Sequence, residues 1–236
     1  MTPNVSALGI ILPSSNRVVE RVTRSVLQDF PGVDACFTRV PYAGHPPDGY
    51  DLEPFRRATT MLAQARPDVI LWNATRGALL GFEPDRRLCA MITSETGIVA
   101  TTTALATAEL LNARRLRRIA LLAQGDDAEG AHLVKTFGAE GIEIVASHNF
   151  GITDNFEAAR VSSDDMERAA TRLASDSNPD AILIWSTNLA GHTLTKGLST
   201  RLGVPVLDST ATGTFAALSH IAHADDSRIG ARQISA

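Results

Sequence analysis

The sequence predicts an α/β protein with two similar halves, each built on a parallel β-sheet. Short apolar runs alternate with longer amphipathic segments along the 236 residues, which is typical of parallel strands joined by helices. A strand–turn–helix pattern also occurs twice, once in each half. Hydrophobic residues make up 44% and charged residues 20% of the chain, so it can form a packed core and is not expected to be disordered.

Eight apolar runs are predicted to be strands. They lie near residues 7–12, 34–40, 68–73, 98–101, 118–123, 142–147, 181–185 and 204–207. A helix is predicted after each strand, near residues 16–30, 52–65, 84–94, 103–112, 127–140, 162–175, 189–202 and 212–221. Ser162, with Asp165 three residues later, has the spacing of a capping-box variant and predicts a helix start.

The repeated segment favours an internal duplication. Residues 67–75 read Pro-Asp-Val-Ile-Leu-Trp-Asn-Ala-Thr, and residues 179–187 read Pro-Asp-Ala-Ile-Leu-Ile-Trp-Ser-Thr. A helix, a strand led by glycine and a turn rich in hydroxyl residues follow each copy. Any two strand–turn–helix units share some likeness, but the matched order of three elements favours duplication. We therefore predict two pseudo-symmetric lobes, residues 1–113 and 114–210.

Three segments are expected to lie outside this repeat. The helix near residues 211–222 is predicted to pack back on the first lobe, and the polar residues 223–236 to form a flexible tail. The loop of residues 42–47, which contains His45, is rich in proline and glycine. It is either an ordinary surface loop or a segment that closes over a ligand.

Charge and cysteine content exclude several classes of function. The net charge of −4 gives no basic footprint for nucleic acid. Two cysteines are too few for a disulfide scaffold and fit a reduced compartment. No apolar run is long enough to span a membrane, and no signal peptide is recognisable. We expect a cytoplasmic protein with neither nucleic acid nor membrane as a partner, and with no metal or cofactor.

Polar loops follow four of the predicted strands. Ligands of parallel sheets bind at the carboxyl ends of the strands, and hydroxyls, amides and free backbone N–H groups at helix starts hold carboxylates well. The same residue types also serve as ordinary helix caps. Four such loops at one sheet edge favour a site for a small anion. Their candidate residues are Ser14, Asn16, Asn73, Thr75, Thr101, Thr102, Thr103, Ser186, Thr187 and Asn188.

Five motifs, in order, resemble the aspartate/glutamate racemase superfamily, in its maleate isomerase and arylmalonate decarboxylase branch. They span residues 13–16, 95–104, 118–122, 151–155 and 202–206, and the likeness runs from about residue 8 to residue 220. The resemblance implies two α/β lobes with the active site in the cleft between them. It also implies that Asn16 and Asn155 bind a small carboxylate, dicarboxylate or amino-acid derivative, and that the protein forms a homo-oligomer.

The sequence departs from this family at the reacting groups. Racemases and isomerases of the superfamily use two cysteines, one per lobe, and arylmalonate decarboxylases keep the second. The equivalent positions here are Ala74 and Ser186, the latter beside Thr187, and the loop around Gly125 lacks the family's tyrosine. The cysteines that are present, Cys36 and Cys89, lie within a predicted strand and a predicted helix, where they are expected to pack as small hydrophobes. Two-thiol proton transfer is therefore not expected.

Other groups near these positions offer different chemistry. Ser186 could act as a nucleophile if His192 served as its base, although a helical histidine is more often a surface or core residue. Arg76 could clamp a second carboxylate in a bidentate manner or form a surface salt bridge. Asn73 and Asn188 flank the substituted positions and could add polar contacts.

The sequence thus leaves three functional hypotheses. The first is an isomerase- or lyase-type enzyme that stabilises an enolate-like intermediate by hydrogen bonds and transfers protons without cysteine. The second is a carboxylate-binding or regulatory protein that has lost catalysis. The third is a hydrolase that depends on Ser186.

Overall fold

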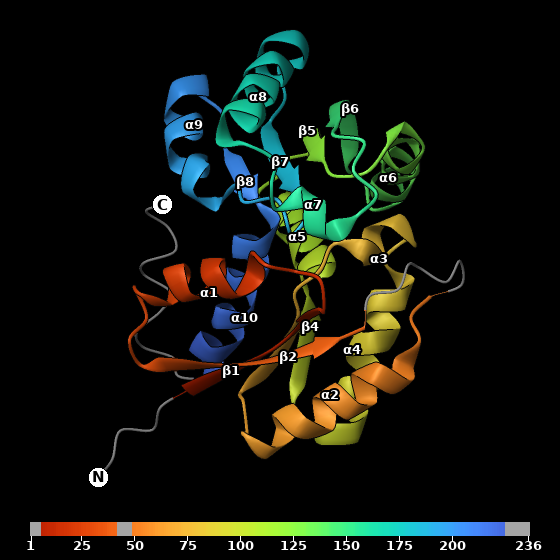
Figure 1. Cartoon of the computed structure of the whole chain (residues 1–236), viewed down its shortest axis with the longest axis vertical. Coiled ribbons are helices and arrows are strands. Elements are labelled where there is room, and N and C mark those ends of the chain that lie inside the picture. Colours follow the sequence, from red (N-terminus) through yellow and green to blue (C-terminus); the bar gives the residue numbers. More distant parts are fainter. Residues whose placement is uncertain (1–5, 42–48, 225–236) are drawn as a thin grey trace.

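A computed structural model of the chain describes residues 6–41 and 49–224, with side chains up to residue 221 within these ranges. Two parallel four-stranded sheets stand one above the other in Figure 1, with strand orders β2-β1-β3-β4 and β6-β5-β7-β8. The strands are β1 (Ser6–Pro13), β2 (Val33–Val40), β3 (Val69–Trp72), β4 (Val99–Thr102), β5 (Arg118–Ala123), β6 (Glu143–Asn149), β7 (Ala181–Trp185) and β8 (Val206–Asp208). The predicted fold class is confirmed.

Helices cover both sheets. They are α1 (Val19–Leu27), α2 (Leu52–Gln64), α3 (Arg76–Leu79), α4 (Glu83–Thr96), α5 (Thr103–Ala113), α6 (Asp127–Ala139), α7 (Asn155–Ala158), α8 (Ser163–Ser177), α9 (Thr195–Leu202) and α10 (Ser209–Ala224), with a 3₁₀ turn, η1 (His192–Leu194), before α9. Each predicted strand and helix is present, mostly with ends that shift by a few residues. The helix predicted at residues 189–202 is the exception, because α9 begins only at Thr195, after η1. The short helices α3 and α7 were not predicted, because four residues show no periodicity.

Two of the predicted segments lie wholly or partly outside the residues that the structure describes. His45 lies in residues 42–48, and most of the predicted tail lies in residues 225–236, so both are outside the described part of the chain. The start of that tail was predicted wrongly, because α10 continues through residues 223 and 224.

The repeated Pro-Asp pair has the same structural role in both halves. The Asp68 carboxylate accepts a hydrogen bond of 2.8 Å from the backbone N–H of Ala7, where β1 begins. The Asp180 carboxylate accepts hydrogen bonds of 2.9 Å from the backbone N–H groups of Arg117 and Arg118, where β5 begins. Each aspartate thus fixes the start of the neighbouring central strand, which supports the duplication.

The last helix of each half packs into the core of the other half. Leu218 of α10 belongs to the same buried cluster as Leu8 of β1. Leu111 of α5 belongs to the same buried cluster as Leu121 of β5. The helices α5 and α10 also contact each other. This exchange holds the carboxyl ends of the two sheets close to each other.

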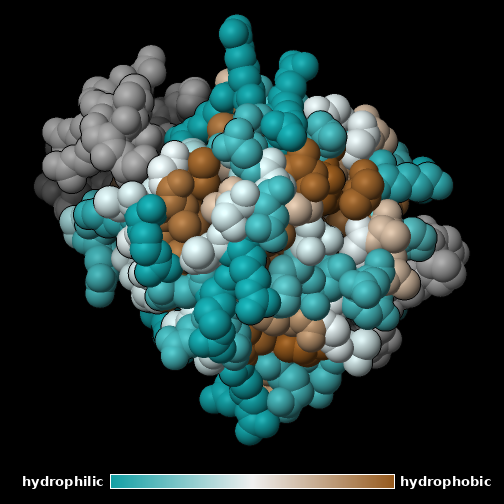
Figure 2. Space-filling model, turned by 90° about the horizontal axis from the view of Figure 1, so that it is seen from above, coloured by the Kyte–Doolittle hydropathy of each residue, from teal (hydrophilic) through white to brown (hydrophobic). Residues whose placement is uncertain are grey.

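The surface gives little sign of a large apolar patch. Figure 2, seen from above the second half, shows mostly hydrophilic residues with hydrophobic ones in separate patches. Met61, Val99 and Val134 are the exposed large hydrophobic residues of the described chain. Within residues 6–41 and 49–224, none of the helices combines the length and apolarity needed to cross a membrane.

Candidate functional site

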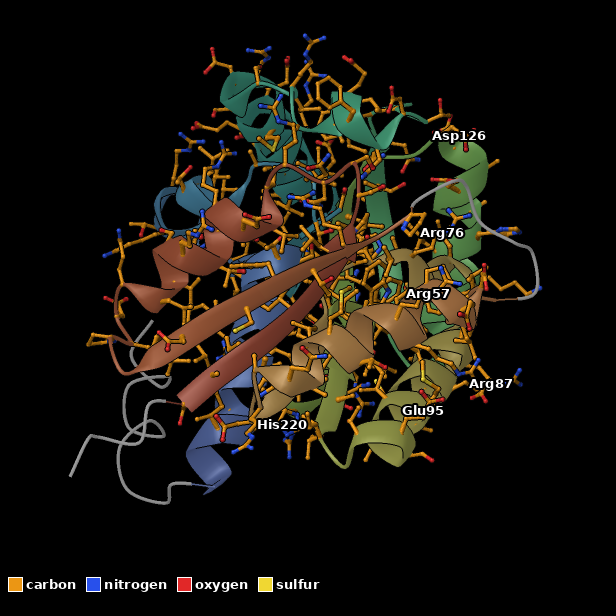
Figure 3. All side chains as sticks on the ribbon, turned by 60° about the horizontal axis from the view of Figure 1, so that its bottom comes forward. Arg57, Arg76, Arg87, Glu95, Asp126 and His220 are labelled. Carbon is orange, nitrogen blue, oxygen red and sulfur yellow. The ribbon has the colours of Figure 1, made fainter. Side chains whose placement is uncertain are left out.

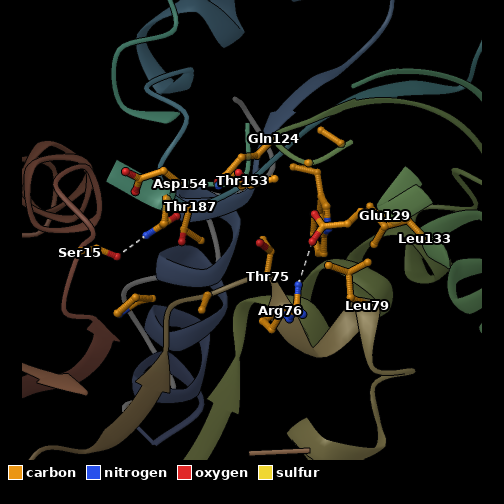
Figure 4. Close-up of a pocket in the computed structure, with 17 residues that line it drawn as sticks. Ser15, Thr75, Arg76, Leu79, Gln124, Glu129, Leu133, Thr153, Asp154 and Thr187 are labelled. Carbon is orange, nitrogen blue, oxygen red and sulfur yellow. Dashed lines mark hydrogen bonds and ion pairs between the residues drawn. The ribbon is translucent and has the colours of Figure 1, made fainter. Parts of the chain in front are cut away.

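A pocket of about 290 Å³ lies between the two halves, where the central strands end (Figure 4). Loops after β1, β3, β5 and β7 and the segment before α7 form its wall. The lining residues are Pro13, Ser15, Ala74, Thr75, Arg76, Leu79, Ala123, Gln124, Gly125, Glu129, Leu133, Thr153, Asp154, Asn155, Trp185, Ser186 and Thr187. The carboxyl-end position is the one expected for ligands of parallel sheets.

The first-lobe wall is the turn that joins β3 to α3. Ala74, Thr75 and Arg76 line the pocket. Asn73 does not: it is fully buried, its side-chain oxygen accepts a hydrogen bond of 2.9 Å from the Thr103 hydroxyl, and its amide donates to the Thr210 carbonyl at 3.3 Å. Asn73 therefore ties the turn to the starts of α5 and α10 and stands behind the wall.

The second-lobe wall centres on Ser186. Its hydroxyl donates a hydrogen bond of 2.6 Å to the side-chain oxygen of Gln124 and accepts one of 3.1 Å from the backbone N–H of Asn188. Gln124 is a neutral amide and cannot take a proton from a hydroxyl. In this arrangement Ser186 is a protonated hydroxyl, and its hydrogen-bond partners among the described residues include neither a histidine nor a carboxylate.

Asn16 contacts the pocket through Thr187. The Asn16 amide oxygen accepts hydrogen bonds of 2.9 Å from the backbone N–H groups of Val18 and Val19, where α1 begins. Its amide nitrogen donates to the Thr187 hydroxyl at 3.2 Å. Thr187 lines the pocket, and Asn16 does not. The sequence placed Asn16 in direct contact with a ligand, whereas the structure places it one layer behind.

A polar network joins the two halves at one side of the pocket. The Asn155 amide donates to the Ser15 hydroxyl at 2.9 Å (Figure 4). The Asn188 amide donates to the Asn155 carbonyl, and its side-chain oxygen accepts a hydrogen bond of 2.9 Å from the backbone N–H of Arg17. Asn155 lines the pocket, and the fully buried Asn188 supports it from behind.

An ion pair joins the halves at the other side. Arg76 of α3 lies 3.2 Å from Glu129 of α6 (Figure 4). The Arg76 side chain is 17% exposed, whereas Arg87, which extends from the edge of the molecule in Figure 3, is 72% exposed. Of the two roles predicted for Arg76, the structure shows a salt bridge, but one in the pocket wall and not on the outer surface.

The two sides of the pocket wall differ in the kinds of side chain that they present. Leu79 and Leu133 lie beside the Arg76–Glu129 pair, on the opposite side from Ser15 and Asp154 (Figure 4). The polar groups around Ser15 and Asp154 therefore face a side that combines two leucines with an ion pair. Such a wall fits a ligand with one polar end and one apolar substituent.

Two other predicted residues lie away from the pocket. Ser14 is exposed and does not line it. His192 lies in η1, does not line the pocket and makes no hydrogen bond to Ser186 in the described chain, and burial lowers its pKa. The proposed Ser186–His192 pair is therefore not formed.

The two cysteines also lie away from the pocket. Cys36 is in β2 and Cys89 is in α4, as predicted, and neither lines the cavity. Burial raises the pKa of Cys89 to about 12. Its sulfur is therefore a neutral thiol at physiological pH, which makes it a poor nucleophile.

Buried carboxyl groups stand behind both walls. Asp85 accepts a hydrogen bond of 3.0 Å from the Tyr50 hydroxyl and packs against Gly77, where an added Cβ would lie 1.3 Å from a carboxylate oxygen. Asp208 accepts a hydrogen bond of 2.9 Å from the backbone N–H of Ala211 at the start of α10. Burial raises the pKa of Asp85 to about 6 and that of Asp208 to about 7.

Sequence reasoning missed several lining residues. Gln124 and Glu129 follow β5. In this segment only the absence of the family's tyrosine was noted from the sequence, and neither the amide nor the carboxylate was singled out. Thr153 and Asp154 lie within a motif that had been singled out for Asn155 alone. In the described parts of the chain, no three His, Cys, Asp or Glu side chains group together as metal ligands would.

The fold and the pocket define a two-lobed α/β protein with a ligand site between pseudo-symmetric lobes. A family model described as arylmalonate decarboxylase matches residues 55–234. This chain belongs to the arylmalonate decarboxylase family, and the superfamily branch predicted from the motifs is confirmed.

Individual relatives agree in sequence and fold. Maleate isomerase of Nocardia farcinica (strain IFM 10152) is 25% identical over 225 residues, which cover 91% of this chain and 89% of the relative. A structure of Nocardia farcinica maleate cis-trans isomerase, a mutant with a covalently bound succinylcysteine intermediate, superposes with a TM-score of 0.80 at 25% identity, covering 92% of each chain. Unliganded arylmalonate decarboxylase gives a TM-score of 0.74 at 22% identity and 91% coverage of each chain, which is a likeness of fold.

Proposed function

We propose that this protein is an isomerase- or lyase-type enzyme that acts on a small carboxylate without a catalytic cysteine. The observation that carries the proposal is the interlobe pocket, in which the hydroxyl residues Thr75, Ser186 and Thr187 come from both lobes. Family membership supports the reaction class, since the relatives are named as an isomerase and a decarboxylase. The resemblance places the family's second thiol at Ser186.

The pocket groups suit an enolate-like intermediate. Hydroxyls and backbone N–H groups that are already in position stabilise charge that develops on carboxylate oxygens. In a lyase reaction, the bond between the carbon and a leaving carboxylate breaks, carbon dioxide departs, and the electron pair stays on the carbon as the enolate-like carbanion. Ser186 then donates its proton to this carbon, and the hydrogen bond from the Asn188 backbone N–H stabilises the alkoxide that remains. Solvent water returns a proton to Ser186. Its hydroxyl turns away from Gln124 for this step.

The pocket also limits the ligand. A volume of about 290 Å³ lies at the lower end of the range of roughly 300–1,000 Å³ for small-molecule sites. We infer a carboxylate whose apolar substituent contacts Leu79 and Leu133. A second carboxylate would meet Arg76, which is already paired with Glu129.

A non-catalytic carboxylate-binding protein is the second candidate. It is favoured by the hydrogen bond from Ser186 to Gln124, because the serine proton is then held by the protein and is not offered to a substrate. The same observation argues against the Ser186-dependent hydrolase, which needs a group to accept the serine proton. Homo-oligomer formation and a cytoplasmic location stay predictions of the sequence.

A ligand screen tests the proposal. Melting temperatures of the purified protein are measured with small mono- and dicarboxylates, with and without apolar substituents. Each stabilising compound is then incubated with the protein in deuterated water and followed by NMR. Loss of carboxylate, isomerisation or deuterium at the carbon next to the carboxylate supports an enzyme, whereas a ligand that stays unchanged supports the binding protein. Thr187→Val identifies binding in the interlobe pocket, because it removes one of the hydroxyls without changing the volume greatly.

A further inference from the structure

A second cavity, of about 510 Å³, lies beside the interlobe pocket and shares Ser15 with it. Four arginines and one glutamate line this cavity, which we call the arginine groove. Its charged or aromatic residues are Arg17, Glu20, Arg21, Arg24, Arg39 and Phe156. Phe156 lies in α7 of the second lobe and the others lie in or next to α1 and β2 of the first. The groove thus crosses between the lobes.

Among the described residues that line the groove, Glu20 is the one carboxylate, and two arginines share it. Glu20 lies 2.7 Å from Arg39 and 3.4 Å from Arg24. Arg39 also donates hydrogen bonds of 2.8 Å and 3.1 Å to the carbonyls of Asn16 and Ser14. Arg39 therefore holds the loop between β1 and α1 in place. Its positive charge is largely balanced by Glu20 and by these carbonyl groups.

Arg17 and Arg21 have no carboxylate partner within the described chain. The Arg17 guanidinium lies over the Phe156 ring, 5.5 Å from its centroid. Arg21 is exposed on α1, next to Glu20 in sequence, and forms no ion pair among the described residues. Two guanidinium groups thus bring positive charge to a concave surface without neutralisation, in a protein whose net charge is −4.

We propose that the arginine groove binds an anion that carries two or more negative charges, from phosphate or from clustered carboxylates. Guanidinium groups bind both by paired hydrogen bonds, and positive charge in a concavity concentrates anions there. The volume of about 510 Å³ falls within the range of roughly 300–1,000 Å³ for small-molecule sites. This site does not depend on the reaction proposed for the interlobe pocket.

Calorimetric titration with pyrophosphate and with citrate, at constant ionic strength, tests the site. Arg17→Gln and Arg21→Gln each remove one groove charge. Arg87→Gln removes the same charge from α4, on the other side of the first lobe from α1 (Figures 1 and 3). We expect each groove variant to weaken binding about tenfold, the effect of one lost charged hydrogen bond, and Arg87→Gln to leave it unchanged.

The two probes and one further variant separate the outcomes. Tighter binding of pyrophosphate identifies a phosphate ligand, and tighter binding of citrate identifies a polycarboxylate. Equal weakening by Arg87→Gln overturns the proposal, because the effect is then general electrostatics. Loss of binding in Thr187→Val but not in Arg21→Gln also overturns it, since the anion then occupies the interlobe pocket. The proposal is also overturned if neither pyrophosphate nor citrate binds at millimolar concentration.

Discussion

The Ser186 hydroxyl donates a hydrogen bond of 2.6 Å to the Gln124 side chain, which joins the end of β7 to the end of β5. This contact places a protonated hydroxyl in the pocket wall and fixes its direction in the resting state. A hydroxyl that stays protonated can give its proton to a carbanion once it turns away from Gln124, whereas a nucleophile must first lose its proton to a base.

Replacement of Ser186 tests its role as proton donor. We expect Ser186→Ala to lower turnover of a ligand found in the screen by about a hundredfold or more, the usual contribution of a positioned acid or base. Binding of the ligand should change far less, since Thr75 and Thr187 stay in place. Turnover and dissociation constants measured on one preparation give both quantities. Turnover equal to that of the wild type would show that another group transfers the proton.

Replacement of Asn16 separates two of its contacts. Asn16→Ala removes the oxygen that accepts from Val18 and Val19 and should lower the free energy of unfolding by about 1 kcal/mol, as lost helix caps do. Asn16→Asp keeps this oxygen but replaces the amide donor by an acceptor, so the Thr187 hydroxyl donates its proton to residue 16 and not to a ligand. Stability should therefore fall less than in Asn16→Ala, while ligand binding weakens. Urea denaturation and ligand titration measure the two effects. Equal loss of stability in both variants would contradict the separation.

The Arg76–Glu129 pair should contribute to the contact between the lobes. We expect a double-mutant cycle of Arg76→Gln and Glu129→Gln to give a coupling free energy of about 1 kcal/mol, at the upper end for exposed pairs because Arg76 is mostly buried. The coupling should decrease in high salt. The matched cycle of Arg87 and Glu83, an exposed pair on α4, should give less. A coupling no larger than that control would show that the pair adds nothing measurable.

The buried Asp208 should make stability depend on pH. Its pKa is raised from an ordinary 3.8 to about 7 in the folded protein, so the folded state holds the proton more tightly than the unfolded state. This contribution to stability is fully present below the ordinary pKa and is lost as pH rises through about 7. Asp208→Asn keeps a capping oxygen for Ala211 but cannot ionise. Urea denaturation at about pH 5 and about pH 8 should show a smaller pH dependence in this variant than in the wild type; an unchanged dependence would assign it to other groups.

The strands could be predicted because each is an apolar run bounded by turn residues. β3 and β7 are the clearest examples: both are completely buried and begin next to the repeated Pro-Asp pair. The helices α3 and α7 could not be predicted in this way, since a single turn depends on its tertiary contacts.

For the candidate site, the sequence predicts which loops form the pocket, because loop position follows from the order of the strands. Ala74, Thr75, Arg76, Asn155, Ser186 and Thr187 line the pocket. The direction of an amide side chain, in contrast, depends on partners that are distant in sequence. Asn16 turns toward Thr187, 171 residues away, and Asn73 turns toward Thr210, 137 residues away. No local pattern indicates such contacts, so both asparagines were placed in the pocket when they stand behind it.

The most direct test of cysteine-free catalysis uses a Cys36→Ser, Cys89→Ser double variant. Its turnover of a screened carboxylate, or its rate of deuterium incorporation from deuterated water, is compared by NMR with that of the wild type and of Ser186→Ala. We expect the double variant to keep its rate within about twofold, since both sulfurs lie outside the pocket, while Ser186→Ala loses most of it. A folded double variant without activity, beside an active Ser186→Ala, would show that a thiol and not Ser186 carries the reaction.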